Sequence, residues 1–316
     1  MSVEPWVWAV FAAVVIGVLA LDLFVFHREA HVVTVREALA WTAVWAALAL
    51  GFGGVLLLWR GPTPAGEYLA GYLIELSLSM DNVFVFAMLF AYFAVSAAHQ
   101  HRVLFWGVVG AIVSRALFIG AGAVLIETFD WVLYVFGALL VVTGVKMARS
   151  GGHERHPEAN PVLRAVRRLV PMTPDYHGQR FFVREGGRWL ATPLVGVLVV
   201  VEATDVMFAI DSVPAIFAVT RDPFLVFTSN AFAILGLRTL YFLLVGMVRR
   251  FVYLQLGLGV LLVLVGAKML LGDVYHVPIW ASLAAIVAVL AAAIGASLWA
   301  TRAGATRREA AGVLGG

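Results

Sequence analysis

The chain has 316 residues, of which 62% are hydrophobic and 13% charged, and its formal net charge is +3. Because a soluble domain is typically about half apolar and about a quarter charged, this composition excludes an ordinary soluble domain and indicates a polytopic membrane protein. The sequence contains no cysteine, so disulfides, thiolate metal sites and cysteine nucleophiles are excluded as well.

Nine apolar stretches are long enough to cross a bilayer, which takes about 20 residues. The first lacks a preceding basic segment and is too long for a signal-peptide core, so we expect it to be a spanning helix. The polar stretch at 150–190 is predicted to be a loop with one amphipathic helix at "NPVLRAVRRLV". The predicted fold is all-α, a polytopic helical membrane protein with spans at 6–26, 38–59, 67–93, 103–126, 131–149, 191–219, 225–248, 251–272 and 277–301.

Lysine and arginine are divided unevenly between the two sides of the membrane that these spans define. The loops after the first, third, fifth and seventh spans, together with the C-terminal tail, carry 17 of the 22 basic residues. The opposite side carries Arg60, Arg221 and Lys268. Because basic residues are concentrated in cytoplasmic loops, this division predicts an external N-terminus and a cytoplasmic C-terminus, in a bacterial inner membrane.

Spans three to five and spans six to eight carry the same motifs in the same order. "ELSLSMDNV" at 75–83 has its counterpart in "DVMFAIDSV" at 205–213, and "GALLVVTGVKM" in the fifth span has its counterpart in "GVLLVLVGAKM" in the eighth. Two copies of an odd number of spans enter the membrane from opposite faces, which predicts a 3+3 inverted repeat of the kind found in secondary transporters. The predicted parts are 1–66 (two spans), 67–149 (first repeat), 150–190 (basic cytoplasmic loop), 191–273 (second repeat) and 274–316 (last span and cytoplasmic tail).

Ionisable side chains fall inside these spans, where a charge is rare and usually functional. Arg115 and Arg238 stand at corresponding places in the two repeats, and pairing of each with one acid would lock helices together. Such ion-pair or gating roles are expected for Asp22, Arg115 and Arg238. The surplus acids would have to protonate or hold a cation. The six carboxylates are Asp22, Glu75, Asp81, Glu202, Asp205 and Asp211.

Helical geometry sorts these residues by direction. At about 100° per residue, Asp81 and Asp211 each point roughly 120° away from the first acid of their copy. Each therefore either meets different neighbours or lies where the helix is broken. Pro214 favours a break in the sixth span, because proline lacks an N–H and leaves the carbonyl of Ile210 free. The groups sharing one face are Glu75 with Ser79 and Asn82, and Asp205 with Glu202 and Ser212.

The available ligands are carboxylate, amide and hydroxyl oxygens, which hard divalent cations such as Mg²⁺, Mn²⁺ and Ca²⁺ prefer. Met80 and Met207 lie beside the acids in sequence and could add a softer sulfur ligand, although packing is the commoner role of methionine. The eight histidines fall in loops or at span edges. No Walker A, dinucleotide-binding or HExxH motif occurs, so we expect neither ATP-driven transport by this chain alone nor an enzyme.

These motifs resemble those of the TerC/Alx family of integral membrane proteins, within the LysE-type transporter superfamily. The resemblance runs from "LDLFVFHREAHVVTVREAL" through "ELSLSMDNVFVF" to "EATDVMFAIDSVPAIFAVTRDPFLVFTSNAFAILGLRTLYF" and "GAKM", and covers most of the chain. The family is associated with Mn²⁺ export and tellurium resistance, and its plant relatives with thylakoid membrane assembly. The resemblance implies Mn²⁺ efflux with metal ligands at Glu75, Asp81, Asn82, Glu202, Asp205, Asp211 and Ser212.

The residues and the resemblance together favour a transporter that exports divalent cations, Mn²⁺ above all, by alternating access and proton antiport. Its expected partners are the lipid bilayer, the metal ion and protons, with no resident cofactor and no nucleic acid. One alternative is a small-solute exporter of the amino-acid type, in which Arg115 or Arg238 would bind a carboxylate. Another is a membrane-assembly or partner-binding factor with structural acids. An intramembrane aspartyl protease ranks last, because the Gly-x-Gly-Asp signature is absent.

Overall fold

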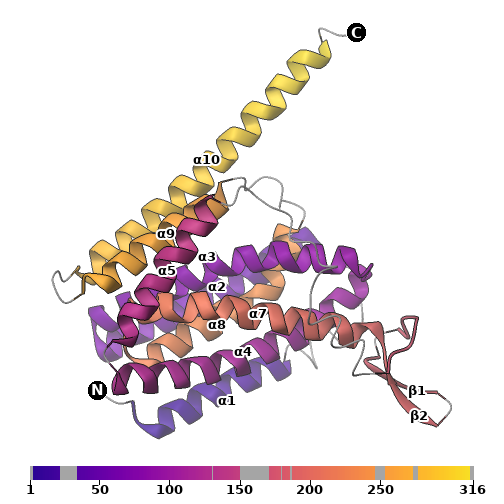
Figure 1. Cartoon of the computed structure of the whole chain (residues 1–316), viewed down its shortest axis with the longest axis horizontal. Helices are drawn as coiled ribbons and strands as arrows, with labels where there is room; N and C mark the ends of the chain where they lie inside the picture. The colour runs from indigo at the N-terminus through magenta and orange to yellow at the C-terminus, as the bar shows by residue number, and fades with distance from the viewer. Residues whose placement is uncertain are drawn as a thin grey trace.

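The computed structural model describes residues 3–21, 34–129, 131–149, 171–178, 180–185, 187–245, 253–272 and 277–313, without the side chains of residues 21, 81, 97, 98 and 302–313. Within these ranges the chain forms nine α-helices and one β-hairpin (Figure 1). The elements are α1 (Pro5–Leu21), α2 (Val35–Arg60), α3 (Pro62–Tyr92), α4 (Ala97–Thr128), α5 (Val132–Arg149), β1 (Phe182–Glu185), β2 (Arg188–Ala191), α7 (Pro193–Phe217), α8 (Pro223–Leu244), α9 (Leu254–Leu270) and α10 (Ile279–Val313).

The helical membrane fold predicted from the sequence is confirmed, and each predicted span overlaps one of these helices. Seven helices are long and apolar enough to cross a membrane, whereas α1 and α9 are apolar but shorter. The predicted count of nine spans therefore stays a prediction. Asp22 and the predicted amphipathic helix "NPVLRAVRRLV" lie outside the described residues.

Local sequence explains where the helices begin. α2 and α3 are separated by Gly61 alone, whose φ of 91° is a conformation that glycine adopts without strain. Pro62 then opens α3, at a position where a backbone N–H has no helical partner to lose. α8 begins after Asp222, whose side chain accepts a hydrogen bond from the N–H of Phe224 at 2.9 Å. These short turns fix the ends of neighbouring helices close together.

Pro214 does not break the sixth predicted span, so that expectation is wrong. α7 is one continuous helix from Pro193 to Phe217, and Pro214 lies in its last turn. The N–H of Ala218 donates to the carbonyl of Pro214 at 3.0 Å, so the helical pattern continues past the proline. Proline has no N–H to donate to the carbonyl of Ile210, so α7 lacks one hydrogen bond there and still continues to Phe217.

α8 forms the centre of the bundle, and most of its side chains are buried. It packs against α2, α3 and α4, and α7 in turn packs against α3 and α4. Figure 1 shows α3, α4 and α7 running in a similar direction, whereas α5, α9 and α10 form a second group that crosses them. Large apolar side chains on the outside, such as Leu58, Leu117 and Trp299, are exposed, as expected for helices that face lipid.

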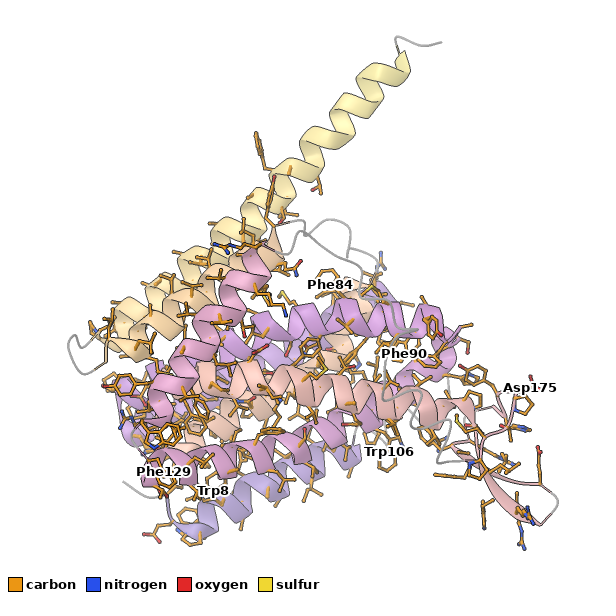
Figure 2. The ribbon with its side chains drawn as sticks, viewed as in Figure 1. Trp8, Phe84, Phe90, Trp106, Phe129 and Asp175 are labelled. Atoms are coloured by element: carbon orange, nitrogen blue, oxygen red, sulfur yellow. The ribbon has the colours of Figure 1, made fainter. Side chains whose placement is uncertain are left out.

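Aromatic side chains connect α8 to α3 and to α1 (Figure 2). Phe90 of α3 packs edge-to-face on Tyr241 of α8, with ring centroids 5.5 Å apart. Trp8 of α1 packs in the same manner on Phe224 of α8, at 5.2 Å. Such pairs add dispersion and quadrupole attraction to simple burial, which matters in lipid because the hydrophobic effect does not drive helices together there.

A β-hairpin precedes α7, in the stretch that we predicted to be a loop. β1 and β2 pair antiparallel, with Phe182 opposite Ala191 and Arg184 opposite Trp189. Thr192 donates a hydrogen bond to the carbonyl of Arg180 at 2.7 Å, which ties the hairpin to the start of the helix. Strands of four residues give too short an alternation to be recognised in so basic a sequence.

α5 and α9 pack backbone against backbone through glycines. A Cβ placed on Gly144 would lie 2.6 Å from the carbonyl oxygen of Gly259, and one on Gly259 would lie 2.7 Å from that of Gly144. Gly137 and Gly266 meet in the same reciprocal way. In the sequence repeat Gly137 corresponds to Gly259 and Gly144 to Gly266. A two-fold axis between inverted repeats would produce this pattern, although the repeat itself stays a prediction.

The glycine contact yields a test of the fold. Gly144→Ala places a methyl group against the backbone of α9, so we expect a loss of stability of about 1–3 kcal/mol from overpacking. The measurement is thermal unfolding of the purified protein in detergent. Gly120→Ala is the matched control, because no atom lies within 4 Å of the added Cβ. An equal melting temperature in both variants would contradict the close packing of α5 on α9.

Candidate cation site

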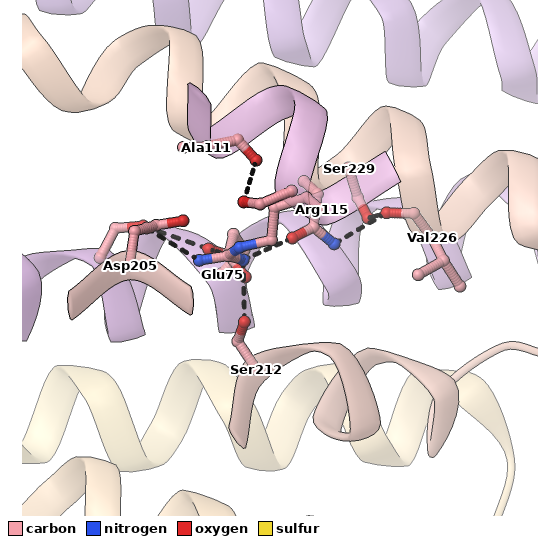
Figure 3. Close-up of polar contacts among 10 residues, drawn as sticks. Glu75, Ala111, Arg115, Asp205, Ser212, Val226 and Ser229 are labelled. Carbon is pink, nitrogen blue, oxygen red and sulfur yellow. Dashed lines mark hydrogen bonds and ion pairs between the residues drawn. The ribbon is translucent and has the colours of Figure 1, made fainter. Parts of the chain in front are cut away.

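The buried arginine of α4 is the centre of the polar interior. Arg115 is 1% exposed, and its guanidinium group reaches oxygen atoms from three other helices (Figure 3). Its Nη1 donates to Glu75 Oε1 of α3 at 2.6 Å. The neighbouring Nη2 lies 3.4 Å from Asp205 Oδ1 of α7. α3 and α7 thus each bring one buried acid to the same cation, as their matching motifs suggest.

Two neutral side chains complete the surroundings of the guanidinium. The Oγ of Ser212, on α7, lies 2.8 Å from Arg115 Nη1, and the Oδ1 of Asn230, on α8, lies 2.7 Å from it. The amide nitrogen of Asn230 donates to the carbonyl of Val226 at 2.9 Å, and this bond turns the amide oxygen toward the arginine. Together with Glu75, these residues place three oxygen atoms around a single nitrogen.

Several polar atoms of this cluster have no hydrogen-bond partner within the described part of the chain. They include the second carboxylate oxygens of Glu75 and Asp205 and the Nε of Arg115. Glu75 and Asp205 are 0% and 2% exposed, so water in bulk does not solvate them. Unpaired buried polar atoms cost free energy, so these atoms call for a further partner, such as a ligand, an ion or a water molecule.

Other predicted ligands flank this cluster. Ser79 donates to Glu75 Oε1 at 3.4 Å, which confirms that the two share a face of α3. Asn82 lies one further turn along and is buried, and its Oδ1 has no partner among the described residues. Glu202 of α7 is half-buried and lies against α4, where a Cβ on Gly110 would be 2.1 Å from its Oε1. A larger residue at 110 would therefore force this carboxylate to move.

The second aspartates of the motifs lie elsewhere or outside the description. Asp211 accepts a hydrogen bond from Thr143 of α5 at 3.1 Å, so it meets a different helix from Asp205. Of the two sequence-based alternatives, different neighbours rather than a broken helix therefore holds for Asp211. Asp81 is on α3, but its side chain is not among those described. Its predicted ligand role stays a prediction.

The two methionines behave differently. Met207 is 57% exposed on the outer surface of α7, so the expectation that it could add a sulfur ligand is wrong. Met80 is partly buried and packs against the apolar clusters between α3 and its neighbours. Arg238, the repeat counterpart of Arg115, is also buried on α8. Its predicted ion-pair or gating role stays a prediction.

Asn230 is the functional candidate that sequence reasoning missed. A single asparagine inside an apolar span carries no charge, and neither repeat motif includes it. The signal that could have found it is the run "TSN" at 228–230, three polar residues in a row inside an apolar span. In the structure all three side chains are fully buried, in the helix that the bundle encloses most completely. Thr228 and Ser229 bond to backbone carbonyls of their own helix, which leaves Asn230 as the one that reaches Arg115.

The described side chains alone do not form a conventional metal centre. Among them, no group of three or more histidine, aspartate and glutamate residues is arranged to hold a metal ion. The oxygen set around Arg115 contains two carboxylates, one hydroxyl and one amide, a donor set that suits hard divalent cations. The guanidinium group occupies the space between them.

A second polar cluster lies at the helix ends. Arg60, the last residue of α2, forms an ion pair with Asp222 at 2.6 Å, and both side chains are partly exposed. Thr220 donates to Glu67 of α3 at 2.6 Å nearby in the same inter-helix region. This cluster has charges of both signs in close contact and serves below as a reference for the buried one.

The fold and the site define a multi-pass integral membrane protein with a cluster of ionisable side chains buried among its helices. The family model described as the integral membrane protein TerC family matches residues 60–305. The chain belongs to the TerC family. The family resemblance inferred from the motifs is therefore confirmed.

Relatives match along nearly the whole chain. An uncharacterized membrane protein of Myxococcus xanthus is 51% identical over 299 residues, which cover 95% of this chain and 94% of the relative. A protein of Escherichia coli K12, named as a candidate membrane-bound redox modulator, Alx, is 48% identical over 304 residues, with 93% and 95% covered. An uncharacterized membrane protein of Rickettsia bellii is 35% identical over 291 residues, with 92% and 96% covered. No solved structure matches the chain.

The burial of the Arg115 ion pair leads to a stability prediction. Glu75→Ala removes the nearest acceptor of the buried guanidinium group and leaves Asp205, at 3.4 Å, as its carboxylate contact among the described residues, so we expect a loss of about 1.5–3 kcal/mol. Arg60→Gln breaks an ion pair at a partly exposed helix end, where we expect about 1 kcal/mol or less. Denaturation of both variants in mixed detergent micelles compares the two. Equal losses of unfolding free energy in the two variants would show that the buried network stabilises the fold no more than the partly exposed ion pair does.

Proposed function

We propose that this protein exports divalent metal cations across a bacterial inner membrane, with Mn²⁺ as its main substrate. The observation that carries the proposal is the pair of fully buried carboxylates, Glu75 and Asp205, which converge from α3 and α7 and retain unpartnered oxygens. Against these two negative charges the described cluster offers one arginine, so a net negative charge remains. A buried negative site inside a membrane bundle favours a cation.

The chemistry of the donors supports a hard cation, and the family resemblance supports manganese among them. Carboxylate, amide and hydroxyl oxygens suit Mg²⁺, Mn²⁺ and Ca²⁺ alike. Because Met207 faces outward, no sulfur donor from α7 tilts the site toward softer metals. The preference for Mn²⁺ therefore rests on the resemblance to TerC/Alx proteins, with Asp81, Asn82, Glu202, Asp211 and Ser212 as the further proposed ligands.

Transport by alternating access requires a site between two parts that can move relative to each other. Glu75 and Asp205 lie near the middle of α3 and α7, the first helices of the two proposed repeats. We propose that proton entry drives metal exit, with an external N-terminus and a cytoplasmic C-terminus. Glu202 is the proposed proton carrier, since it lies one turn from Asp205 but outside the contacts of Arg115.

The competing functions account for less of this arrangement. The relative from Escherichia coli is named as a candidate redox modulator, but this chain has no cysteine and so cannot act by thiol exchange. A metal exporter would change redox balance indirectly, through the pool of redox-active metal. An amino-acid exporter would use Arg115 to bind a substrate carboxylate, yet that arginine already contacts two acids. We propose neither an enzyme activity nor a resident cofactor.

The first transport prediction concerns Asp205. In proteoliposomes with a metal-sensitive dye inside, the unchanged protein should move Mn²⁺ with saturable kinetics. Asp205→Asn should reduce the rate at least about tenfold, because one charge lost from a buried site removes more than about 1.4 kcal/mol of cation binding. Glu127→Gln removes an exposed carboxylate near the end of α4 and should transport normally.

Each result of this assay has a defined meaning. Saturable Mn²⁺ flux that disappears in Asp205→Asn supports the exporter. Absence of flux for Mn²⁺, Mg²⁺ and Ca²⁺ in folded protein would refute it and favour an assembly factor or a different solute. Equal flux in Asp205→Asn and in Glu127→Gln would leave a transporter but overturn the assignment of its site.

The second transport prediction concerns proton coupling. With a pH dye alongside the metal dye, Mn²⁺ movement should be accompanied by proton movement in the opposite direction. In Glu202→Gln, the proton signal and the uphill accumulation driven by a pH gradient should be lost, while downhill Mn²⁺ flux should continue at a reduced rate because a proposed ligand has lost its charge. A full proton signal in Glu202→Gln would assign the proton to another acid, whereas its absence in the unchanged protein would exclude antiport.

A further inference from the structure

We propose that the guanidinium group of Arg115 occupies the place of the transported cation when the site is empty, and that the metal must displace it to bind. Asn230 of α8 then becomes a metal ligand that neither acidic motif contains. This inference rests on the proposed export of divalent cations and adds how the empty site is held.

The geometry around one nitrogen atom carries the inference. Glu75 Oε1, Asn230 Oδ1 and Ser212 Oγ lie 2.6, 2.7 and 2.8 Å from Arg115 Nη1. They come from three different helices, α3, α8 and α7. Since a terminal guanidinium nitrogen bears only two hydrogens, it cannot give a good hydrogen bond to all three. Three oxygen atoms that converge on one point are arranged like the ligands of a cation rather than like the acceptors of a structural arginine.

The unpartnered oxygens of the acids indicate what the shell lacks. Glu75 Oε2 and Asp205 Oδ2 are buried and have no partner among the described residues. The guanidinium group contacts one carboxylate oxygen of each acid and leaves the second oxygen without a partner among the described residues. A divalent ion binds carboxylates through one or both oxygens at about 2.0–2.6 Å, so it can draw in atoms that the guanidinium leaves out.

Charge makes the two cations exclude each other. The formal charges of Glu75, Asp205 and Arg115 sum to −1. A divalent ion added beside the guanidinium would raise the cluster to +1 within about 4 Å, where like charges repel strongly in a low-dielectric interior. Binding is therefore an exchange, in which the arginine leaves the acids as the metal arrives.

This exchange gives the arginine a purpose in the transport cycle. After the metal has left, two bare carboxylates in the membrane interior would be costly, and the carrier would have to reorient with them exposed to an apolar medium. Return of the guanidinium neutralises one of these charges. Arg115 is thus a positioning residue that lets the empty carrier complete its cycle.

The test is equilibrium Mn²⁺ binding to the full chain purified in detergent, by calorimetry. If Arg115 competes with the metal, Arg115→Gln should lower Kd by about tenfold or more. Removal of a positive charge could also act through space, and Arg115→Lys separates the two effects. Lysine keeps the charge but is too short to reach the three oxygens, so displacement predicts a Kd between those of the Gln variant and the unchanged protein. Arg60→Gln should bind as the unchanged protein does.

Asn230 has its own pair of variants. In the Arg115→Gln background, where no guanidinium remains to be held, Asn230→Ala should raise Kd about tenfold because an amide ligand is lost. Ser229→Ala in the same background is the matched control, since that hydroxyl donates to the carbonyl of Val226 within its own helix. An unchanged Kd in Asn230→Ala would overturn the ligand assignment.

The outcomes separate this inference from the proposed function. Binding to the unchanged protein with equal or weaker binding to Arg115→Gln overturns displacement and leaves the exporter standing. Binding to neither refutes both. A Kd for Arg115→Lys equal to that of the unchanged protein shows an effect of charge alone and also overturns displacement. Should Arg115→Gln fold poorly, the melting temperature decides: displacement predicts a larger rise on adding Mn²⁺ in Arg115→Lys than in the unchanged protein.

Discussion

The contact between Arg115 and the oxygens of α3, α7 and α8 is the constraint on which the rest of the structure depends. A guanidinium group inside lipid has no water to solvate it, so the protein must supply the partners. Three helices do so, from three separate stretches of sequence. The distances between α4 and these three helices, and the face that each helix turns toward Arg115, are thereby constrained by hydrogen-bond geometry. No apolar contact would specify one arrangement of near-parallel helices so narrowly.

Small residues make room for this polar interior. A Cβ on Gly110 would collide with the carboxylate of Glu202, and one on Gly71 would lie 2.8 Å from the hydroxyl of Ser229. Gly144 and Gly259 serve a different end, since they bring the backbones of α5 and α9 together without any polar side chain between them. Glycine therefore leaves space for polar side chains in the first helix group, whereas in the second it lets two helix backbones touch with no side chain between them. The second group can pack rigidly, while the first retains unsatisfied atoms.

Sequence reasoning could find the acids because charge in an apolar span is conspicuous and because the motif occurs twice. It could also give the direction of Asp211, since helical rotation is set by spacing alone. Partner choice was beyond it: nothing in one dimension tells whether Arg115 meets Glu75, Asp205 or both. Asn230 escaped because it carries no charge and belongs to neither copy of the motif. The predicted break at Pro214 is wrong for a related reason, since the effect of a proline depends on how many helical residues follow it, and α7 ends at Phe217.

The two motif copies match in sequence but not in their contacts, and this difference bears on transport. Ser212 contacts Arg115, whereas Asn82, its counterpart on α3, lies buried with its Oδ1 unpartnered among the described residues. A symmetric arrangement would give both residues equivalent partners. Under the proposed alternating-access cycle, two inverted copies exchange conformations, so the two ends of the site are never equivalent at one time. The structure then represents one of two related states, and the unpartnered amide oxygen of Asn82 marks the half of the site that is out of use in it.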